Sequence, residues 1–364
     1  MSIVHKRPSK PMAIWGMSDK SASANKTGKM EMSSRFGSNG PLSRRRALAV
    51  GGTLSGGLIA ASTSAAFGAA RFKSPSSGGS PIIRVGGGGT QLPVDQIEAI
   101  LQAQGEVSES GVLSVEIDRN DLPNVTRNGV PFLPSFMING TAYFQALGNG
   151  QAILNGVVAL TDKEIDPFID ALVRNGLIFQ AFHQHFYDLT PMIWFIHYRN
   201  IGDPLQLAQA LFNSITQATS TPFPQPPPPQ TTPLPADQLA QILGGSAMIG
   251  GNGVVTVNVP RADRIRLQGV PIAGDEGIGL DIAFEPLSDG TTVVAPDFSM
   301  TASEVMPVTR VMRQQGWDNN CLYNQETDEQ PQLFFSHQVK IGDAVQLAQE
   351  VRNGANKTNL MFSS

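Results

Sequence analysis

The sequence predicts an α+β protein built from two tandem copies of a two-layer α/β sandwich with a mainly antiparallel sheet. The first observation is an internal repeat, in which residues 92–96 align with residues 234–238. The second is that a later register, offset by 140 residues, persists as far as residues 201–203 and 341–343. The third is that helical and strand periodicities follow one another in the same order in both copies. A repeat of this length indicates duplication of a whole domain rather than a solenoid.

Each copy is expected to contain a helix, three strands, a helix, two strands and a final helix. In the first copy these predicted elements span residues 94–102, 112–117, 135–146, 152–160, 161–176, 178–187, 192–199 and 204–215. The second copy offers matching strands over residues 254–259, 279–284 and 291–295. Antiparallel strands with helices on one face form a two-layer sandwich. Because helices interrupt the strand pairs, we expect a ferredoxin-like topology.

The second helix of each copy has a start signal. Thr161 and Glu164 have the spacing of a capping box, and Thr301 and Glu304 repeat it. A capping box satisfies two free amides at a helix start, so it predicts that a helix begins at this point in both copies. Glu164 is also a candidate general base, but the cap accounts for this residue without a catalytic role.

The chain is expected to begin with a twin-arginine signal peptide (residues 1–70) and a flexible leader (71–89). These are followed by the first copy (90–218), a Pro-rich linker (219–233), the second copy (234–353) and a C-terminal tail (354–364). The run of prolines at 226–229 predicts a semi-rigid polyproline II spacer between the two copies.

The signal peptide is predicted from Arg44, Arg45 and Arg46, which precede an uncharged stretch that ends in small residues. We expect cleavage between Ala66 and Arg71. An uncleaved membrane anchor is the alternative, but the many Gly, Ser, Thr and Ala residues make the stretch only weakly hydrophobic. The expected location is therefore the periplasm or the cell exterior, with no stable membrane anchor after cleavage.

Charge and cysteine content exclude several classes of function. Residues 1–70 contain ten Lys or Arg and only two Asp or Glu, whereas the whole chain has a net charge of −4, so the remainder is acidic. An acidic body repels phosphate backbones and anionic lipids, which argues against nucleic-acid partners and peripheral membrane binding. The single cysteine, Cys321, cannot form an intramolecular disulfide.

The histidines form the main chemical signal. His183, His185, His197 and His337 all lie in the predicted strand pairs. Residues i and i+2 of a strand point to the same face, so His183 and His185 are expected to be neighbours. A turn centred on Thr190 places His197 directly opposite His183. Three neutral imidazoles with an open coordination position are typical of Zn²⁺ sites. The sequence therefore predicts a site for a divalent transition metal at His183, His185 and His197.

Other interpretations of the histidines remain open. Half-buried histidines also satisfy hydrogen bonds or line an interface. At the matching positions the second copy has Tyr323, Gln325 and His337, a poor set of zinc ligands. The second copy is then a degenerate supporting domain, or its His337 reaches across toward the first copy. The turn residue Asp188 is the candidate for a fourth ligand.

A family resemblance rests on motifs around these histidines: His183-Gln184-His185-Phe186, Pro191, Phe195-Ile196-His197, Ile201-Gly202-Asp203-Pro204 and Leu207-Ala208. Through them the chain, from residue 92 to its end, resembles the LppY/LpqO family of secreted bacterial proteins. The resemblance implies export and a duplicated domain of unknown function. Members typically have His-Asn-His at residues 183–185, and often an acidic residue where this chain has Thr190. The acylated cysteine of the lipoprotein members is absent.

Three classes of function follow from these observations. The first is an exported protein that binds a small molecule or a metal ion through the histidine cluster. The second is a metal-dependent hydrolase in which the same histidines hold the ion and a bound water is the nucleophile. The third is a noncatalytic structural or interaction protein of the cell envelope. Few acid or base candidates lie near the histidines, only Tyr187, Asp188 and Arg199, which favours binding over catalysis.

Overall fold

A computed structural model describes residues 92–122, 124–219 and 231–363. The twin-arginine motif, the leader and most of the Pro-rich linker lie outside these ranges. Within the described ranges, no helix has the length and apolar character needed to cross a membrane.

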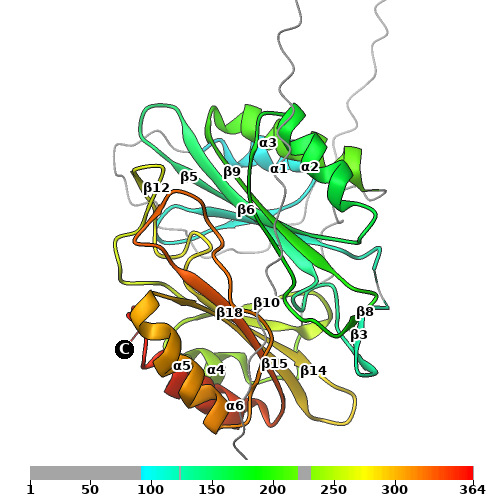
Figure 1. Ribbon diagram of the computed structural model, residues 1–364, viewed down its shortest axis with the longest axis vertical. Coiled ribbons are helices and arrows are strands. Elements are labelled where there is room, and N and C mark those ends of the chain that lie inside the picture. The colour runs from blue at the N-terminus through cyan, green and yellow to red at the C-terminus, as the bar shows by residue number, and fades with distance from the viewer. Residues whose placement is uncertain (1–91, 123, 220–230, 364) are drawn as a thin grey trace, which may run out of the picture. The chain divides into compact units, whose positions relative to one another are not determined.

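The first copy contains three helices, a large sheet and a small sheet (Figure 1). Its elements are α1 (Val94–Leu101), β1 (Gly105–Val107), β2 (Leu113–Asp118), β3 (Thr126–Arg127), β4 (Val130–Pro131), β5 (Asn139–Ala146), β6 (Ala152–Leu160), α2 (Ile165–Arg174), β7 (Ile178–His183), β8 (Leu189–Thr190), β9 (Trp194–Gly202) and α3 (Pro204–Ala218).

The second copy repeats this order. Its elements are α4 (Ala236–Leu243), β10 (Ser246–Ile249), the short 3₁₀ turn η1 (Gly251–Gly253), β11 (Val255–Val259), β12 (Arg266–Leu267), β13 (Val270–Pro271), β14 (Leu280–Pro286), β15 (Thr292–Met300), α5 (Ala302–Gln314), β16 (Asp318–Asn319), β17 (Glu329–Gln330), β18 (Phe334–Gly342) and α6 (Ala344–Ala355).

The two large sheets have the same topology. Their strand orders are β1-β2-β5-β6-β9-β7 and β10-β11-β14-β15-β18-β16. Neighbouring strands of both sheets pair antiparallel. The predicted α+β class and the duplication are confirmed. The ferredoxin-like topology is wrong, because four strands of the large sheet precede α2, whereas a βαββαβ fold has a helix after its first strand.

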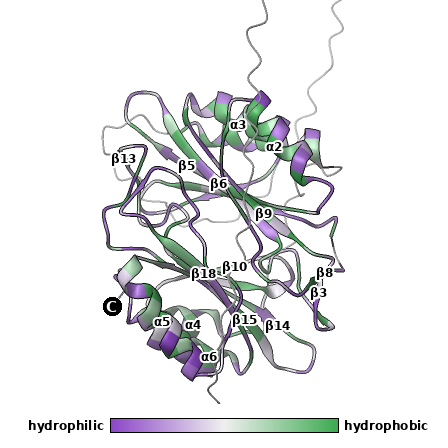
Figure 2. Ribbon diagram, in the orientation of Figure 1, coloured by the Kyte–Doolittle hydropathy of each residue, from purple (hydrophilic) through white to green (hydrophobic). Residues whose placement is uncertain are grey.

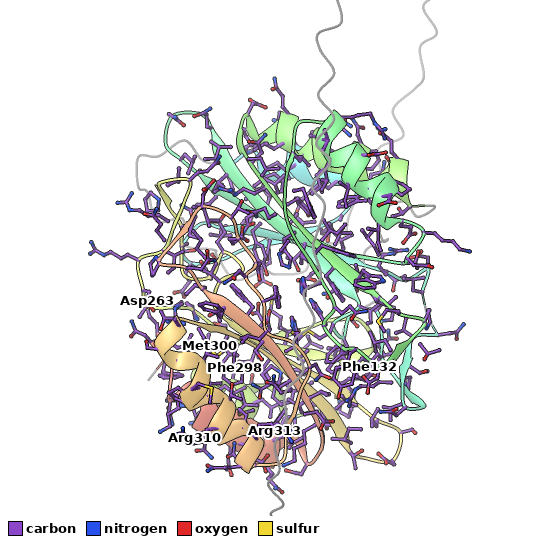
Figure 3. The ribbon with its side chains drawn as sticks, viewed as in Figure 1. Phe132, Asp263, Phe298, Met300, Arg310 and Arg313 are labelled. Atoms are coloured by element: carbon purple, nitrogen blue, oxygen red, sulfur yellow. The ribbon has the colours of Figure 1, made fainter. Side chains whose placement is uncertain are left out.

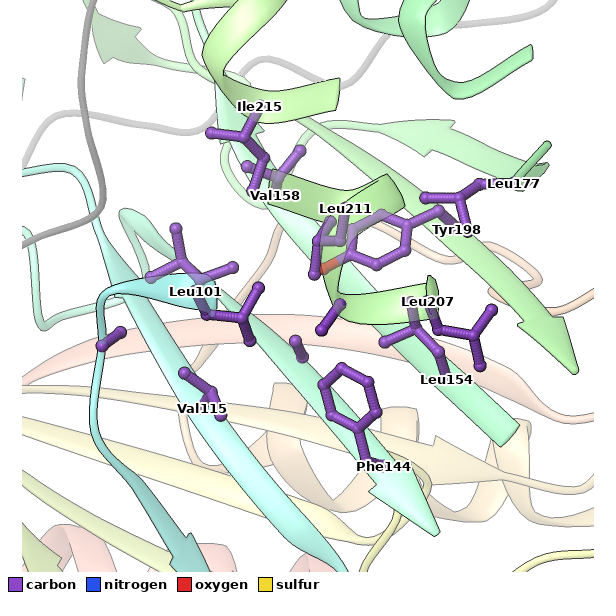
Figure 4. Close-up of a cluster of buried hydrophobic side chains, with 14 of the residues drawn as sticks. Leu101, Val115, Phe144, Leu154, Val158, Leu177, Tyr198, Leu207, Leu211 and Ile215 are labelled. Atoms are coloured by element: carbon purple, nitrogen blue, oxygen red, sulfur yellow. The ribbon is translucent and has the colours of Figure 1, made fainter. Parts of the chain in front are cut away.

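The helices cover one face of each sheet. In the first copy the helix-covered core includes Phe168 of α2. Figure 4 shows two other members of this core, Leu101 of α1 and Leu211 of α3. In the second copy it includes Phe298 and Met300, which Figure 3 labels. Helices α2 and α3 carry both hydrophobic and hydrophilic residues (Figure 2), as expected when only one side of a helix packs on a sheet. Burial of this apolar surface holds each copy together.

The opposite faces of the two sheets contribute to shared cores. One buried cluster joins Phe132, Phe186 and Phe195 of the first copy to Ala295 and Val339 of the second. A further cluster joins one residue of β6 to several residues of the second copy. The inner face of each sheet is therefore covered by the other copy, and this contact surrounds the histidines.

A matched pair of hydrogen bonds also links the copies. The backbone amide of Ala273 donates to Oε1 of Gln145 at 2.7 Å. At the equivalent positions, 140 residues apart in each case, the backbone amide of Leu133 donates to Oε2 of Glu285 at 3.0 Å. The side chain at this position therefore accepts a backbone hydrogen bond from the other copy in both cases. It is the amide of Gln145 in the first copy and the carboxyl group of Glu285 in the second.

A helix begins near the predicted position in both copies, but its first residue differs between the copies. Helix α5 begins with a complete capping box between Thr301 and Glu304. Helix α2 begins at Ile165, three residues later than its counterpart, although the backbone amide of Thr161 still donates to Glu164 at 2.8 Å. Glu164 also accepts two hydrogen bonds from the buried guanidinium of Arg119, each at 3.0 Å. These contacts account for Glu164 as a structural residue.

Candidate metal centre

The strand register differs from the predicted one around the histidines. His183 pairs with Phe195, and His197 pairs with Ala181, so the partner of His183 lies two residues away from the predicted one. His197 is therefore diagonal to His183 rather than directly opposite. The two residues still share a face of the sheet, and their ring centroids are 5.0 Å apart.

Strand β7 ends at His183, so His185 lies beyond the strand rather than on it. The predicted strand over residues 178–187 was too long, because the chain leaves the large sheet and then forms β8 against β3. The rings of His183 and His185 are nevertheless neighbours, with centroids 5.1 Å apart. The pair predicted from the i, i+2 spacing thus comes together through a bend in the chain.

The third member of the tightest group comes from the second copy. Ligand atoms of His183, His185 and His337 all lie within 4.8 Å of one another. His197 lies beside this trio but is not part of the group that meets this distance. His337 thus reaches across to the first copy, which was one of the open interpretations of the sequence.

Aromatic stacking holds the rings in place. His185 is sandwiched between Phe195, at a centroid distance of 3.3 Å, and His337, at 3.7 Å. His183 stacks on Tyr323 of the second copy at 3.6 Å. Because residues of both copies take part in these stacks, the positions of the imidazoles depend on the packing of one copy against the other.

Burial keeps all four imidazoles neutral. The exposed fraction is 9% for His183, 7% for His185, 3% for His197 and 1% for His337. Loss of hydration lowers the pKa of His197 and His337 to about 3. It also lowers the pKa of His183 and His185 well below the usual value of 6.5. Neutral imidazole is the form that coordinates metal ions.

Several ring nitrogens have no protein partner within the described part of the chain. Both nitrogens of His183 and of His197, and Nδ1 of His185, are buried without a hydrogen bond. His185 forms a hydrogen bond with the backbone of Met137. Nδ1 has no partner, so Nε2 makes this bond and carries the proton, and the Nδ1 lone pair is free. Buried polar atoms of folded proteins normally have a partner, so these nitrogens are available to coordinate a ligand.

His337 is flanked by two further polar groups. Its Nδ1 lies 3.2 Å from the thiol of Cys321, and its Nε2 lies 3.5 Å from Oδ2 of Asp297. Burial raises the pKa of Cys321 to about 12 and that of Asp297 well above 3.8. A carboxyl group at this position can orient a ligating imidazole, as outer-shell groups do in metal sites.

Asp297 was missed by the sequence analysis, although the register explains its place. Asn258 pairs with Asp281, Asp281 with Asp297 and Asp297 with His337 across four neighbouring strands. Directly opposed residues point to the same face of a sheet, so these four side chains form one polar row. Only knowledge of the strand pairing could have identified this row.

The acid and base candidates taken from the sequence do not join the cluster. Asp188 accepts hydrogen bonds from Arg127 at 2.8 Å and Asn128 at 3.2 Å. Tyr187 is 57% exposed. Arg199 donates to Gln180 at 2.9 Å. The carboxyl group nearest to a cluster imidazole among these contacts is Asp297, from the second copy.

Comparison with known proteins identifies the family to which the chain belongs. The family model described as Domain of Unknown Function (DUF1259) matches residues 95–217 and again residues 237–357. No curated protein and no solved structure matches the chain significantly. The two matches together span more than half of the chain and coincide with the two structural copies. The chain therefore belongs to the family described as Domain of Unknown Function (DUF1259), of which it contains two tandem domains.

Proposed function

We propose that this chain is an exported protein that binds a divalent transition metal through His183, His185 and His337. The observation that carries the proposal is that potential ligand atoms of these three buried histidines lie within 4.8 Å of one another. Zn–N bonds are about 2.0 to 2.1 Å long, so the imidazoles must rotate from their stacked positions to bring three nitrogens to one ion. The free Nδ1 of His185 and the free nitrogens of His183 support the same conclusion.

His197 is the candidate fourth ligand in this proposal. Its two nitrogens are buried without a partner in the described part of the chain, and its ring is 5.0 Å from that of His183. Imidazole nitrogen suits Zn²⁺, Cu²⁺, Ni²⁺ and Fe²⁺. A fourth imidazole favours a closed, tetrahedral site of the kind that holds Zn²⁺ firmly.

The test is elemental analysis of the protein purified without a histidine tag, compared with His337→Ala and His197→Ala variants. We expect about one equivalent of metal per chain, loss of that metal in His337→Ala, and partial retention in His197→Ala. If the metal is lost in His197→Ala but kept in His337→Ala, the ligands are instead His183, His185 and His197. Protein that neither contains nor takes up Zn²⁺, Cu²⁺, Ni²⁺ or Fe²⁺ contradicts the proposal.

Hydrolysis is the second candidate, and burial disfavours it. A catalytic metal needs an open position that substrate can reach. The three imidazoles are at most 9% exposed, and His185 is covered on both faces by Phe195 and His337. We therefore favour binding of the ion over a metal-dependent reaction.

Export is proposed from the residues before the first copy. Arg44, Arg45 and Arg46, followed by the uncharged stretch, are typical of a twin-arginine signal, and the resemblance to the secreted LppY/LpqO proteins points the same way. This pathway carries folded cargo, which suits a site assembled from two domains. N-terminal sequencing of exported protein is expected to find a start between Ala66 and Arg71. A membrane-embedded chain that still begins near Met1 or Met32 contradicts export as a soluble protein.

A further inference from the structure

The first copy contains a surface cavity of about 250 Å³ at the start of α3. Its walls are the turn after α2 (residues 175–177), the end of β9 (residues 200–202) and the first turns of α3, as far as Ala210. The helices lie on the sheet face opposite to the histidines, so the cavity is separate from the histidine cluster. A cavity of this size is smaller than the pockets of drug-sized ligands and suits a small metabolite.

The second copy repeats the frame of this cavity. Residues 341–343, 346 and 347 are identical to residues 201–203, 206 and 207 of the first copy. Three other positions carry much larger side chains in the second copy, namely Trp317 for Leu177, Lys340 for Asn200 and Glu350 for Ala210. Because the two copies share one topology, the cavity of the first copy corresponds to the space that these three side chains occupy in the second.

The three larger side chains form an ion pair and an aromatic support. Nζ of Lys340 donates to Oε2 of Glu350 at 2.7 Å, and Nε1 of Trp317 donates to the same oxygen at 2.9 Å. The indole ring of Trp317 is fully buried. This place in the fold therefore accommodates an ammonium group and a carboxylate group in contact, next to apolar surface.

The first copy keeps the group that receives the ammonium. In the second copy, Nζ of Lys340 also donates to the backbone oxygen of Gln315 at 2.7 Å. The equivalent residue of the first copy is Asn175, which lines the cavity. Asn200 stands in place of the lysine, but its side-chain amide donates to the backbone oxygen of Gly176 at 2.6 Å. Within the described residues, the carbonyl group of Asn175 therefore lacks the ammonium that its counterpart receives.

The first copy also keeps the group that receives the carboxylate. In the second copy, Nε2 of Gln346 donates to Oε1 of Glu350 at 3.1 Å. The equivalent amide of the first copy is that of Gln206, in the cavity wall, and Ala210 stands in place of the glutamate. The backbone amides at the start of α3 already donate to Asp203. The side chain of Gln206 is therefore the donor that this cavity offers to a carboxylate.

We propose that this cavity binds a free α-amino acid with an apolar side chain. The ammonium and carboxylate groups of an α-amino acid are attached to one carbon, so they lie side by side, as the ion pair of the second copy does. The ammonium donates to the carbonyl group of Asn175, and the carboxylate accepts from the amide of Gln206. The ligand side chain packs on Leu177, which is smaller than its counterpart Trp317. A zwitterion has no net charge, which suits walls whose one ionisable side chain, Asp203, already caps α3.

The test is calorimetric titration of L-leucine, and separately L-alanine, into the full chain. We expect one amino acid per chain, and binding weakened at least about tenfold in Gln206→Ala, since a hydrogen bond to a charged group is lost. The triple variant Leu177→Trp/Asn200→Lys/Ala210→Glu should not bind, because it places the side chains of the second copy in the same frame. Gln209→Ala, on the exposed side of α3, is the control and should bind like the wild type. The variant without the histidine pair 183 and 185 should also bind, which separates this proposal from the metal site.

Three results overturn the inference. The first is a wild-type chain that shows neither binding heat nor a shift in melting temperature with millimolar L-leucine or L-alanine. The second is equal affinity for propylamine or propionate, each of which carries only one of the two charges. The third is unchanged affinity in the triple variant, which would place the bound amino acid elsewhere. If the triple variant does not fold, Gln206→Ala decides, because it changes an exposed side chain, and unchanged affinity in that variant contradicts the proposal.

Discussion

Replacing His183 and His185 by alanine is expected to abolish transition-metal binding and the stabilisation that comes with it. Two of the three proposed ligands are then lost, and His337 with only His197 beside it is too small a ligand set to hold the ion. A ligand present at 100 times its dissociation constant stabilises the folded state by about 2.7 kcal/mol. For a folded region of this size, that corresponds to roughly 5 to 10 °C in melting temperature. The measurement is thermal unfolding with and without added Zn²⁺.

The matched control for this variant is Gln325→Ala, at the position of the second copy that corresponds to His185. It removes a buried side chain without removing an imidazole, so the Zn²⁺-dependent shift should remain. The single variant His185→Gln introduces the residue that the second copy already has, and it serves if the double variant does not fold. An equal Zn²⁺-dependent shift in wild type and double variant contradicts the metal site.

Replacing Glu285 by glutamine is expected to stabilise the protein at neutral and alkaline pH. Burial raises the pKa of Glu285 from 4.5 to about 7, so the folded protein holds this proton more tightly than the unfolded chain. The stability that the protonated Glu285 side chain contributes is fully present below pH 4.5 and is lost as the pH rises through about 7. Each pKa unit corresponds to about 1.4 kcal/mol, so the advantage of the variant above pH 7 is about 3.5 kcal/mol at most.

Gln145 shows that glutamine can serve at this position. It occupies the equivalent place in the first copy and accepts a backbone hydrogen bond there, so Glu285→Gln should keep the bond from Leu133. Chemical denaturation of wild type and variant at pH 4.5, 6 and 8 measures the difference, which isolates Glu285 from other titrating groups. The exposed-residue variant Glu109→Gln should show no such trend. A pH-independent difference for Glu285→Gln contradicts the explanation.

The fold was predictable to the extent that it follows periodicity along the chain. The long register between the copies predicted the duplication, and the spacing of Thr301 and Glu304 predicted the start of α5. The topology was not predictable, because the order of strands in a sheet depends on long-range pairing. The two-residue strands β3 and β8 are too short to have a period of their own, and they end the predicted strand before His185.

The candidate site was only half predictable for the same reason. The spacing of His183 and His185 placed them together, and a shared face placed His197 nearby. The participation of His337 depends on how the inner faces of the two sheets meet, which no pattern within one copy specifies. Asp297 and Tyr323 reach the cluster through the same contact. The chemistry therefore lies where the duplicated domains meet, and a single copy does not contain it.

The most direct measurement is anomalous X-ray diffraction from a crystal of the Zn²⁺-loaded protein, collected on both sides of the zinc absorption edge. We predict one anomalous peak bonded to nitrogens of His183, His185 and His337 at about 2.0 to 2.1 Å. A fourth bond to His197 is consistent with this result. The absence of a peak among these residues, or a peak that lies on exposed residues only, would contradict the account.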